Sequence, residues 1–416
     1  MKLHQKICLI LVALFPIQTS FHFWPEWSMV LGLKVDYLSP TIYLTDLILF
    51  LVLLFWFFDI LKSRFEWPKI SLVYLLLALL FIISNIYFSH NPQVNLLKWF
   101  KILELGIFTF YLYRNIRFKQ ILLPLGLSII FTSIIALIQF FKQASIGPIW
   151  WLGERPLSIA QPGIAKTIIN GQLLMRPYST FPHPNAMAGF LVVVLTLIVL
   201  SRSQIAMRLK LLIVLLGITA LIISFSRSAW LVGLLLLAVV FFRRFYPRIN
   251  FKQYKYFLIT GFMFVSVFGY WLFRLPLAGN ESWSERLFLA QVGFKLFLNS
   301  PIIGIGLNNF LVELSNFWQS GQIFLLQPIH NIFLLTLVET GLIGLVFLLT
   351  FFLFILRRLY LLAIVKKYPD SFSLLVSLIL ICLLGTTDHY WFTLQQNLLL
   401  LTLVIAFSLK DLSKSE

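Results

Sequence analysis

The sequence predicts an all-α polytopic membrane protein, a helix bundle of about twelve transmembrane helices. Of the 416 residues, 60% are hydrophobic and only 12% are charged, a balance that lies outside the range of soluble globular domains. Apolar runs long enough to cross about 30 Å of hydrocarbon also recur along the whole chain. Because no linker or soluble domain interrupts them, we expect residues 1–416 to form a single integral membrane domain.

Each predicted span is an apolar run bounded by polar or basic residues, and helices are the structures that satisfy their own backbone groups in lipid. The spans are read at 7–24, 41–61, 70–88, 96–113, 120–141, 184–200, 211–226, 228–242, 256–273, 329–356, 371–387 and 393–409. Met1–Ile17 has the basic start and apolar core of a signal peptide, but no small-residue cleavage site follows, so we interpret it as a retained span. Cys8 and Cys382 fall inside predicted spans and indicate neither a disulfide framework nor a metal site.

The positions of the basic residues predict the topology. A net charge of +18 is compatible with nucleic-acid binding, but most basic residues lie in every second connection, as the positive-inside rule expects of a membrane protein. Such residues are Lys2, Lys6, Lys62, Arg64, Lys69, Arg114, Arg117, Lys119, Arg202, Arg208, Lys210, Arg243, Arg244, Arg248, Lys252, Lys255, Arg357, Arg358, Lys366, Lys367, Lys410 and Lys414. We therefore predict a bilayer rather than nucleic acid as the partner, and cytoplasmic positions for both termini.

The opposite side carries two long segments, 142–183 and 274–329, which we expect to be helical extracytoplasmic loops. Arg176 lies in the first segment, although the positive-inside rule disfavours basic residues on this side of the membrane. It is either a surface arginine that snorkels or a functional group. Asn185 and Ser179 are candidate helix caps near the sixth span. In the second segment, a tight turn is the favoured explanation for Gly304 and Gly306.

Two further positions carry charge or polarity at the outer boundary. Arg227 lies in the tight connection between the seventh and eighth spans, where an arginine is either a headgroup anchor or an anion ligand; the flanking serines favour the anion ligand. His330, with Asn331, begins an apolar span, and an ionisable group there is costly and indicates function. The alternative is a histidine that merely caps its helix. On a continuous helix, Gly341 and Gly344 share the His330 face and form a closely packable stripe.

The outer segments predict neither metal nor covalent catalysis, because they show no Asp-x-Asp pair, no metal-ligand cluster and no nucleophile motif. Arginines can hold a diphosphate and stabilise the charge that develops as it leaves. A histidine can take a proton from an attacking hydroxyl. Since nucleotide sugars are not supplied outside the cytoplasmic membrane, the simplest activated glycan there is one carried on a lipid diphosphate. No cofactor is expected.

Four groups of residues carry a resemblance to a known family. They are Arg176 with the following Pro177–Asn185, Arg227 with Leu231, Pro301 with Gly304 and Gly306, and His330-Asn331 with Gly341 and Gly344. The spacing from His-Asn to Gly-x-x-Gly is the most specific. Together they resemble the bacterial O-antigen ligase and O-antigen polymerase superfamily of membrane glycosyltransferases.

The resemblance implies a fold of the GT-C type in the bacterial inner membrane, with the active site on the extracytoplasmic side. It implies metal-independent, inverting transfer of a glycan from undecaprenyl diphosphate to a hydroxyl of a lipid, glycan or protein acceptor. By the same resemblance, Arg176 and Arg227 bind the donor diphosphate and His330 activates or orients the acceptor. The remaining substrate-binding candidates are Arg286, Arg155, Asn185 and Asn331.

Several functions stay open at this point. A ligase, a polymerase that joins lipid-linked repeat units and a protein-glycosylating transferase all use the same kind of donor. A transporter of lipid-linked sugars is the alternative from another class, and it predicts broken helices and polar residues near the midplane. Glu104 and Glu339 are the main polar residues of that kind, so transport is the less favoured reading.

Overall fold

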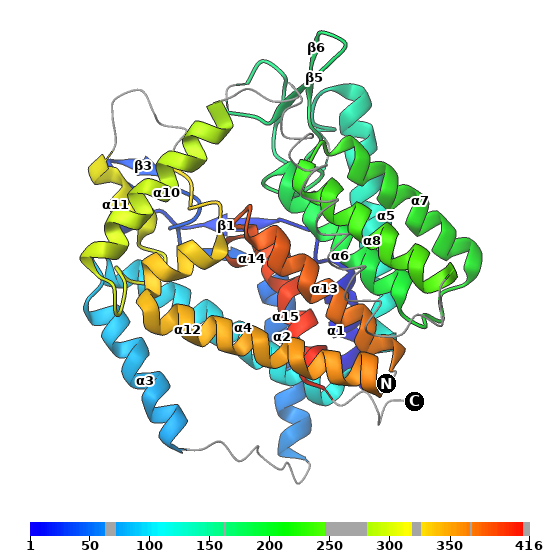
Figure 1. Ribbon diagram of the computed structural model, residues 1–416, viewed down its shortest axis with the longest axis horizontal. Coiled ribbons are helices and arrows are strands. Elements are labelled where there is room, and N and C mark those ends of the chain that lie inside the picture. The colour runs from blue at the N-terminus through cyan, green and yellow to red at the C-terminus, as the bar shows by residue number, and fades with distance from the viewer. Residues whose placement is uncertain are drawn as a thin grey trace. The chain divides into compact units, whose positions relative to one another are not determined.

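The computed structural model describes residues 1–62, 72–147, 149–161, 163–245, 281–317, 326–366 and 368–410, and this part of the chain is mostly helical (Figure 1). The chain divides into two compact units, each built from separated stretches. The first unit comprises Met1–Arg117, Glu281–Arg358 and Gly385–Asp411. The second comprises Phe118–Asn280, Leu359–Leu384 and Leu412–Glu416.

The first unit contains both ends of the described chain and the helix that follows His330. Its helices are α1 (Leu3–Ala13), α2 (Leu44–Leu61), α3 (Leu72–Tyr87), α4 (Pro92–Asn115), α10 (Glu281–Asn299), α11 (Phe310–Leu314), α12 (Ile332–Tyr360), α14 (Tyr390–Thr393) and α15 (Gln395–Leu409). Helix α1 packs on α2, and α4 packs on both α3 and α15. Asn91 caps α4 through a side-chain bond to the Val94 amide, with Pro92 in the first turn.

A small β-structured segment connects α1 to α2, which the sequence reading did not anticipate. Strand β1 (Ser20–His22) pairs antiparallel with β4 (Thr41–Tyr43), and β2 (Met29–Val30) pairs with β3 (Leu33–Lys34). The 3₁₀ turn η1 (Glu26–Ser28) lies between them. The first predicted span, 7–24, was therefore too long. Helix α1 ends at Ala13 because Pro16 lacks an amide donor and disfavours helical geometry at Phe15.

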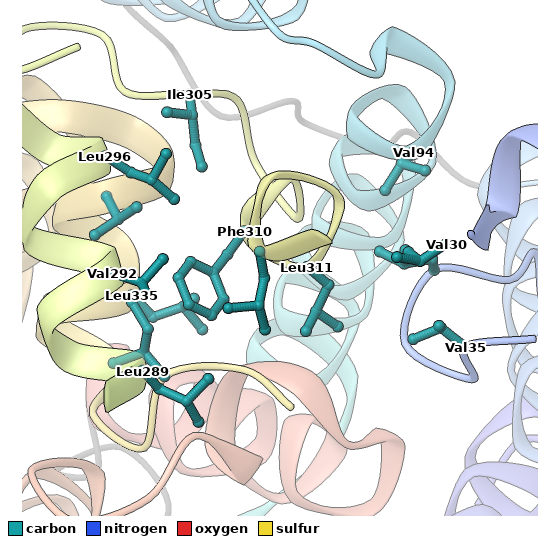
Figure 2. Close-up of a cluster of buried hydrophobic side chains, with 14 residues drawn as sticks. Val30, Val35, Val94, Leu289, Val292, Leu296, Ile305, Phe310, Leu311 and Leu335 are labelled. Carbon is teal, nitrogen blue, oxygen red and sulfur yellow. The ribbon is translucent and has the colours of Figure 1, made fainter. Parts of the chain in front are cut away.

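The core of the first unit gathers apolar side chains from four helices and the β-structured segment (Figure 2). Phe310 of α11 is 1% exposed and lies between α10, which contributes Leu289 and Val292, and the loop that carries Val35. A buried phenylalanine ring removes a large apolar area from contact with solvent and contributes strongly to local packing. The core therefore joins the β-structured segment to α4, α10, α11 and α12.

Helix α12 is broken at Gly341, where φ is 66° and ψ is −168°. The chain segment just after Pro301 lies alongside the break and satisfies its backbone groups. Leu342 N donates to the Pro301 carbonyl (2.8 Å) and Ile305 N donates to the Val338 carbonyl (3.0 Å). Asn85 adds a bond from its amide to the Glu339 carbonyl (3.0 Å). In a membrane protein such a break needs these internal partners.

The break corrects the prediction for the glycines of this helix. A continuous helix would place Gly341 and Gly344 on the same face as His330. The positive φ of Gly341 interrupts the regular helical rotation from His330 to Gly344, so the predicted shared face does not form. The turn prediction for Gly304 and Gly306 agrees with their positive φ of 79° and 101°. Gly304 additionally allows close approach, because an added Cβ would lie 2.5 Å from the Thr340 amide nitrogen.

The second unit is built around α6. Its helices are α5 (Phe118–Lys142), α6 (Pro184–Leu200), α7 (Met207–Ile223), α8 (Arg227–Phe245) and α13 (Pro369–Gly385). The π turn η5 (Leu361–Val365) lies between α12 and α13 in the sequence. Helix α6 packs against α5, α7 and α8. Almost every α6 residue is buried, and the sequence Phe-Leu-Val-Val-Val shows why, because it has no polar face to expose.

In its described residues, the predicted loop 142–183 is not helical beyond Lys142, apart from the short 3₁₀ turn η2 (Trp150–Leu152). It forms a hairpin in which β5 (Lys166–Ile169) pairs antiparallel with β6 (Gln172–Met175). The two turn residues, Asn170 and Gly171, both have positive φ, 49° and 78°. An Asn-Gly pair flanked by β-branched and apolar residues is a strong hairpin signal, and it was overlooked. The predicted loop 274–329 does contain helices, α10 and α11, in its described part.

Three helices of the described chain are long and apolar enough to cross a membrane: Leu44–Leu61, Phe118–Lys142 and Ile332–Val365. Shorter apolar helices lie near six further predicted spans. The chain is thus a helical membrane protein, whereas the number of twelve spans stays a prediction. The predicted span 256–273 lies outside the described residues.

Candidate functional site

In the first unit, His330 lies directly against a second histidine. The ring centroids of His330 and His389 are 5.1 Å apart and the rings meet at 73°, edge to face. His389 and its neighbour Asp388 are each 5% exposed, whereas His330 is half-buried. The two histidines come from separate stretches of this unit, one just before α12 and the other just before α14. Asp388 and His389, which are adjacent in the sequence, are therefore part of the His330 site.

His389 is held on three sides. Its Nδ1 is hydrogen-bonded to the Thr393 hydroxyl (2.6 Å), and the edge of its ring meets Tyr37 at 5.6 Å between centroids. Asp388 lies on the third side, with Oδ1 4.0 Å from Nε2 of His389. Burial lowers the pKa of His389 to about 4, against the opposing influence of Asp388. At neutral pH this imidazole is therefore uncharged.

Asn331, rather than His330, caps helix α12. Its Oδ1 accepts hydrogen bonds from the amides of Phe333 (2.9 Å) and Leu334 (3.0 Å), and its Nδ2 donates to the Thr386 carbonyl (3.2 Å). Asparagine is among the preferred N-cap residues for this reason. The capping role that was the alternative explanation for His330 is thus filled by its neighbour, and His330 lies just outside the helix end.

Arg286 of α10 joins the same turn. Its Nη1 donates to the Thr387 carbonyl (3.0 Å), one residue before Asp388. Arg286 and Asn331 therefore hold adjacent carbonyl groups, those of Thr387 and Thr386, and define the position of the turn that presents Asp388 and His389 to His330. In this structure both side chains support the histidine pair.

His330, Asp388 and His389 each offer one ligand atom, and these atoms lie within 4.8 Å of one another. The prediction of no metal-ligand cluster on the outer side missed this group, because its members belong to separate predicted spans. Two imidazoles and a carboxylate are ligands of a type that suits a divalent transition metal. Arg286 and Lys98, however, place positive charge near His389, which disfavours a cation. We therefore interpret the cluster as a group that handles protons and hydrogen bonds.

In the second unit, Arg176 is hydrogen-bonded to the turn that precedes Arg227. Its Nε donates to the Ser224 carbonyl (2.8 Å), and its Nη2 donates to Oδ1 of Asn185 (2.6 Å). Helix α8 begins at Arg227, after a turn in which Phe225 has a positive φ of 51°. The Arg176 guanidinium is thus held at the turn from which helix α8 begins with Arg227, and positive charge beside a helix N-terminus favours a bound anion.

Arg155 and Arg176 both lie near Tyr178. Burial raises the pKa of the Tyr178 phenol, while the positive charges of Arg176 and Arg155 act in the opposite direction. The phenol oxygen accepts a hydrogen bond from the Ala165 amide (2.6 Å), and Arg155 is exposed. Tyr178 belongs to the motif that follows Arg176, but the sequence alone assigned it no role.

The predicted caps of α6 were wrong. His183 is the N-cap, because its Nδ1 accepts from the Asn185 amide (3.1 Å), whereas Asn185 lies in the first turn and binds Arg176. Proline is favoured at the first helical position, so Pro184 places the cap one residue earlier. Ser179 lies in a preceding turn with φ of 54°, where its amide donates to Oε1 of Gln139 (2.7 Å).

The candidate residues fall into two groups, and the structure brings together the members of each. The group in the first unit is His330, Asn331 and Arg286, joined by Asp388, His389 and Tyr37. The group in the second unit is Arg176, Arg227, Asn185 and Arg155, joined by Tyr178. The sequence contained one signal for Asp388 and His389. Two adjacent ionisable residues at a membrane boundary carry a high desolvation cost, which indicates a functional role.

Comparison with known families gives a match over part of the chain. Residues 212–349 match the family model described as O-antigen ligase. A comparison with curated proteins gives no match. The matched region includes Arg227, Arg286, His330 and Asn331, whereas Arg155, Arg176 and Asn185 precede it. The match to the O-antigen ligase model over residues 212–349 supports the assignment to the O-antigen ligase and O-antigen polymerase superfamily of membrane enzymes.

Proposed function

We propose that the protein is an O-antigen ligase-like glycosyltransferase of the bacterial inner membrane. It moves a glycan from an undecaprenyl-diphosphate donor to an acceptor hydroxyl on the extracytoplasmic side, without a metal and with inversion at the anomeric carbon. The observation that carries this proposal is the family match, because it spans both an arginine at the Ser224–Arg227 turn and the histidine that contacts His389.

In this proposal Arg176 and Arg227 bind the diphosphate of the donor. Guanidinium groups match phosphate geometry with paired hydrogen bonds, and they stabilise the charge that grows on the diphosphate as it leaves. Arg176 is already held by the Ser224 carbonyl and Asn185. A group that is oriented before the reaction stabilises the transition state without reorganising. Arg155 adds positive charge in the same unit.

His330 takes the proton of the acceptor hydroxyl as its oxygen attacks the anomeric carbon. The bond from that carbon to the diphosphate oxygen breaks at the same time, and the diphosphate leaves with the electron pair. A positive charge then develops on the His330 ring. The neighbouring His389 is uncharged at neutral pH, so it does not repel this charge, and Asp388 stabilises it.

A polymerase or protein-glycosylating transferase would use the same donor, and the acceptor distinguishes them. A transporter of lipid-linked sugars gains one supporting feature, the broken helix α12. The groups at that break, however, are bonded to residues 301–306 and Asn85, whereas transporters use such ends to bind substrate. The charges of α4 are also paired internally, since Lys101 contacts both Asp46 (2.7 Å) and Glu104 (2.8 Å). Transport therefore remains the weaker alternative.

The test is to incubate the purified protein with a lipid-diphosphate glycan, with and without a separate acceptor, in the presence of EDTA. We expect a new glycosidic bond that persists in EDTA and is lost by about 100-fold or more in H330A and R227A. R114A, which removes an exposed arginine at the end of α4, is the matched control and should retain activity.

The products separate the alternatives. A bond to a second donor molecule indicates a polymerase, and a bond to another lipid or to a protein indicates a ligase or protein transferase. Glycan movement across the bilayer without a new bond indicates a transporter. Full activity in both H330A and R227A, with each variant folded, would overturn the proposed site.

A further inference from the structure

The two-stranded ribbon of β1 and β4 exposes its apolar side. Phe21 is 64% exposed, its cross-strand partner Ile42 is 45% exposed, and Phe23, two residues further along, is 43% exposed. Side chains two residues apart in a strand point to the same face, and the rings of Phe21 and Phe23 meet there at 4.9 Å between centroids. These three side chains, which we call the apolar ribbon face, therefore form one continuous apolar surface.

The other side of the ribbon is polar and is hydrogen-bonded internally. Nε2 of His22 lies 3.2 Å from the Ser20 hydroxyl, and its Nδ1 lies 2.7 Å from the Ser39 hydroxyl and 3.0 Å from the Thr41 hydroxyl. All four residues are half-buried. In an antiparallel sheet with one face in water, the polar side chains lie on the water face and the apolar ones pack inward. The ribbon has the reverse arrangement, so its exposed face suits an apolar medium.

The apolar ribbon face continues onto helix α2, which is long and apolar enough to cross a membrane. Leu44, the first residue of α2, donates its amide hydrogen to the Thr19 carbonyl (2.9 Å), so the ribbon is bonded directly to the start of the helix. Tyr43 is extended, with φ of −90° and ψ of 151°, so Ile42 and Leu44 point to the same side. An exposed apolar stripe then follows along α2, made of Leu44, Leu47, Phe50 and Leu51.

The length of α2 places the ribbon at the edge of the membrane. The helix has 18 residues, which extend for about 27 Å at 1.5 Å per residue and nearly match the hydrocarbon thickness of about 30 Å. Leu44 therefore lies at one edge of the hydrocarbon, and the ribbon that precedes it lies at the depth of the lipid headgroups and the adjoining acyl chains. Apolar and aromatic side chains at this depth bury themselves in lipid when polar groups occupy the opposite side of their element.

We propose that the apolar ribbon face inserts into the bilayer leaflet at the N-terminal end of α2 and anchors the β-structured segment to the membrane. The partner is the acyl-chain region of phospholipids, because the three side chains carry no charge or hydrogen-bonding group and the exposed stripe of α2 continues them. Tyr37, whose ring meets His389, lies between β3 and β4, so the anchor also fixes the depth of that contact. The inference is independent of the proposed glycosyl transfer.

The experiment places nitroxide spin labels on single cysteines of the full chain in vesicles of phosphatidylethanolamine and phosphatidylglycerol. The background is C8A/C382A, which removes both native cysteines. F21C and I42C report on the apolar ribbon face, F50C on the exposed stripe of α2 is the lipid reference, and E26C, at an exposed position of the same β-structured segment, is the matched control. Collisions of each label with oxygen, which concentrates in hydrocarbon, and with a water-soluble nickel chelate are measured.

We expect the ratio of oxygen to nickel collisions to be several-fold higher for F21C and I42C than for E26C, and close to the ratio for F50C. A ratio equal to that of E26C would place the face in water and overturn the inference. Low collision rates with both reagents, together with spin–spin broadening, would show contact with a second copy of the chain and would also overturn it. If F21C or I42C unfolds at a lower temperature than the background protein, F23C on the same face takes its place.

Discussion

Replacement of Gly341 by alanine distinguishes a broken helix α12 from a continuous one by the sign of the stability change. In a continuous helix, alanine is favoured over glycine by about 1 kcal/mol, so G341A would be more stable. In the structure, Gly341 has φ of 66° and ψ of −168°, a region that is essentially restricted to glycine. A side chain there costs about 1–3 kcal/mol in backbone strain alone.

The surroundings of Gly341 add a second cost. An added Cβ would lie 2.6 Å from the Ile303 amide nitrogen and would clash with the Ile302 carbonyl. Both atoms are backbone, and they belong to the segment that satisfies the break, so they cannot move without loss of its hydrogen bonds. We expect G341A to lose about 3–5 kcal/mol of unfolding free energy, in the range of the most damaging single substitutions.

Two controls separate the causes. Gly106 lies within α4 with no atom within 4 Å of an added Cβ, so G106A should be slightly stabilising. Gly32 has φ of 76° in open space, so G32A should show the conformational cost without the clash. The measurement is the midpoint of thermal unfolding in detergent. If G341A is as stable as G106A, the break and the backbone contacts inferred at Pro301–Gly306 are refuted.

Two further predictions concern charged groups of the first unit. The pKa of His389 is about 4 in the folded protein and about 6.5 in the unfolded chain, so the unfolded chain binds a proton first as the pH falls. The contribution of His389 to the free energy of unfolding is therefore complete above about pH 6.5 and falls by about 3 kcal/mol as the pH approaches 4. H389Q should show a shallower decline in unfolding midpoint between pH 7 and pH 4.5, and a decline equal to the wild type would contradict the assignment. K101M leaves the Asp46 and Glu104 carboxylates without their shared cation and should lower the free energy of unfolding, measured with denaturant, by about 2–4 kcal/mol. The double variant K101M/E104Q should recover part of that loss. Strictly additive effects of the two substitutions would argue against the pairing.

Local features of the sequence determined the class of the protein and several functional candidates. Hydropathy is a property of consecutive residues, so the membrane character and most helix positions were predictable without tertiary contacts. Arg227 and His330 stood out because a charged or ionisable group at a membrane boundary is costly wherever the chain places it. The Asn170-Gly171 hairpin was also encoded locally, although it was not recognised.

Contacts between distant segments were decided only by the tertiary structure. Asp388 and His389 contact His330 because Arg286 and Asn331 bind the turn before them, and no pattern within one segment predicts that pairing. The break at Gly341 depends in the same way on the backbone of residues 301–306, which supplies the hydrogen bonds that a broken membrane helix needs. His330 thus was identifiable as a costly group from sequence, whereas its partners were determined by packing between parts of the chain far apart in sequence.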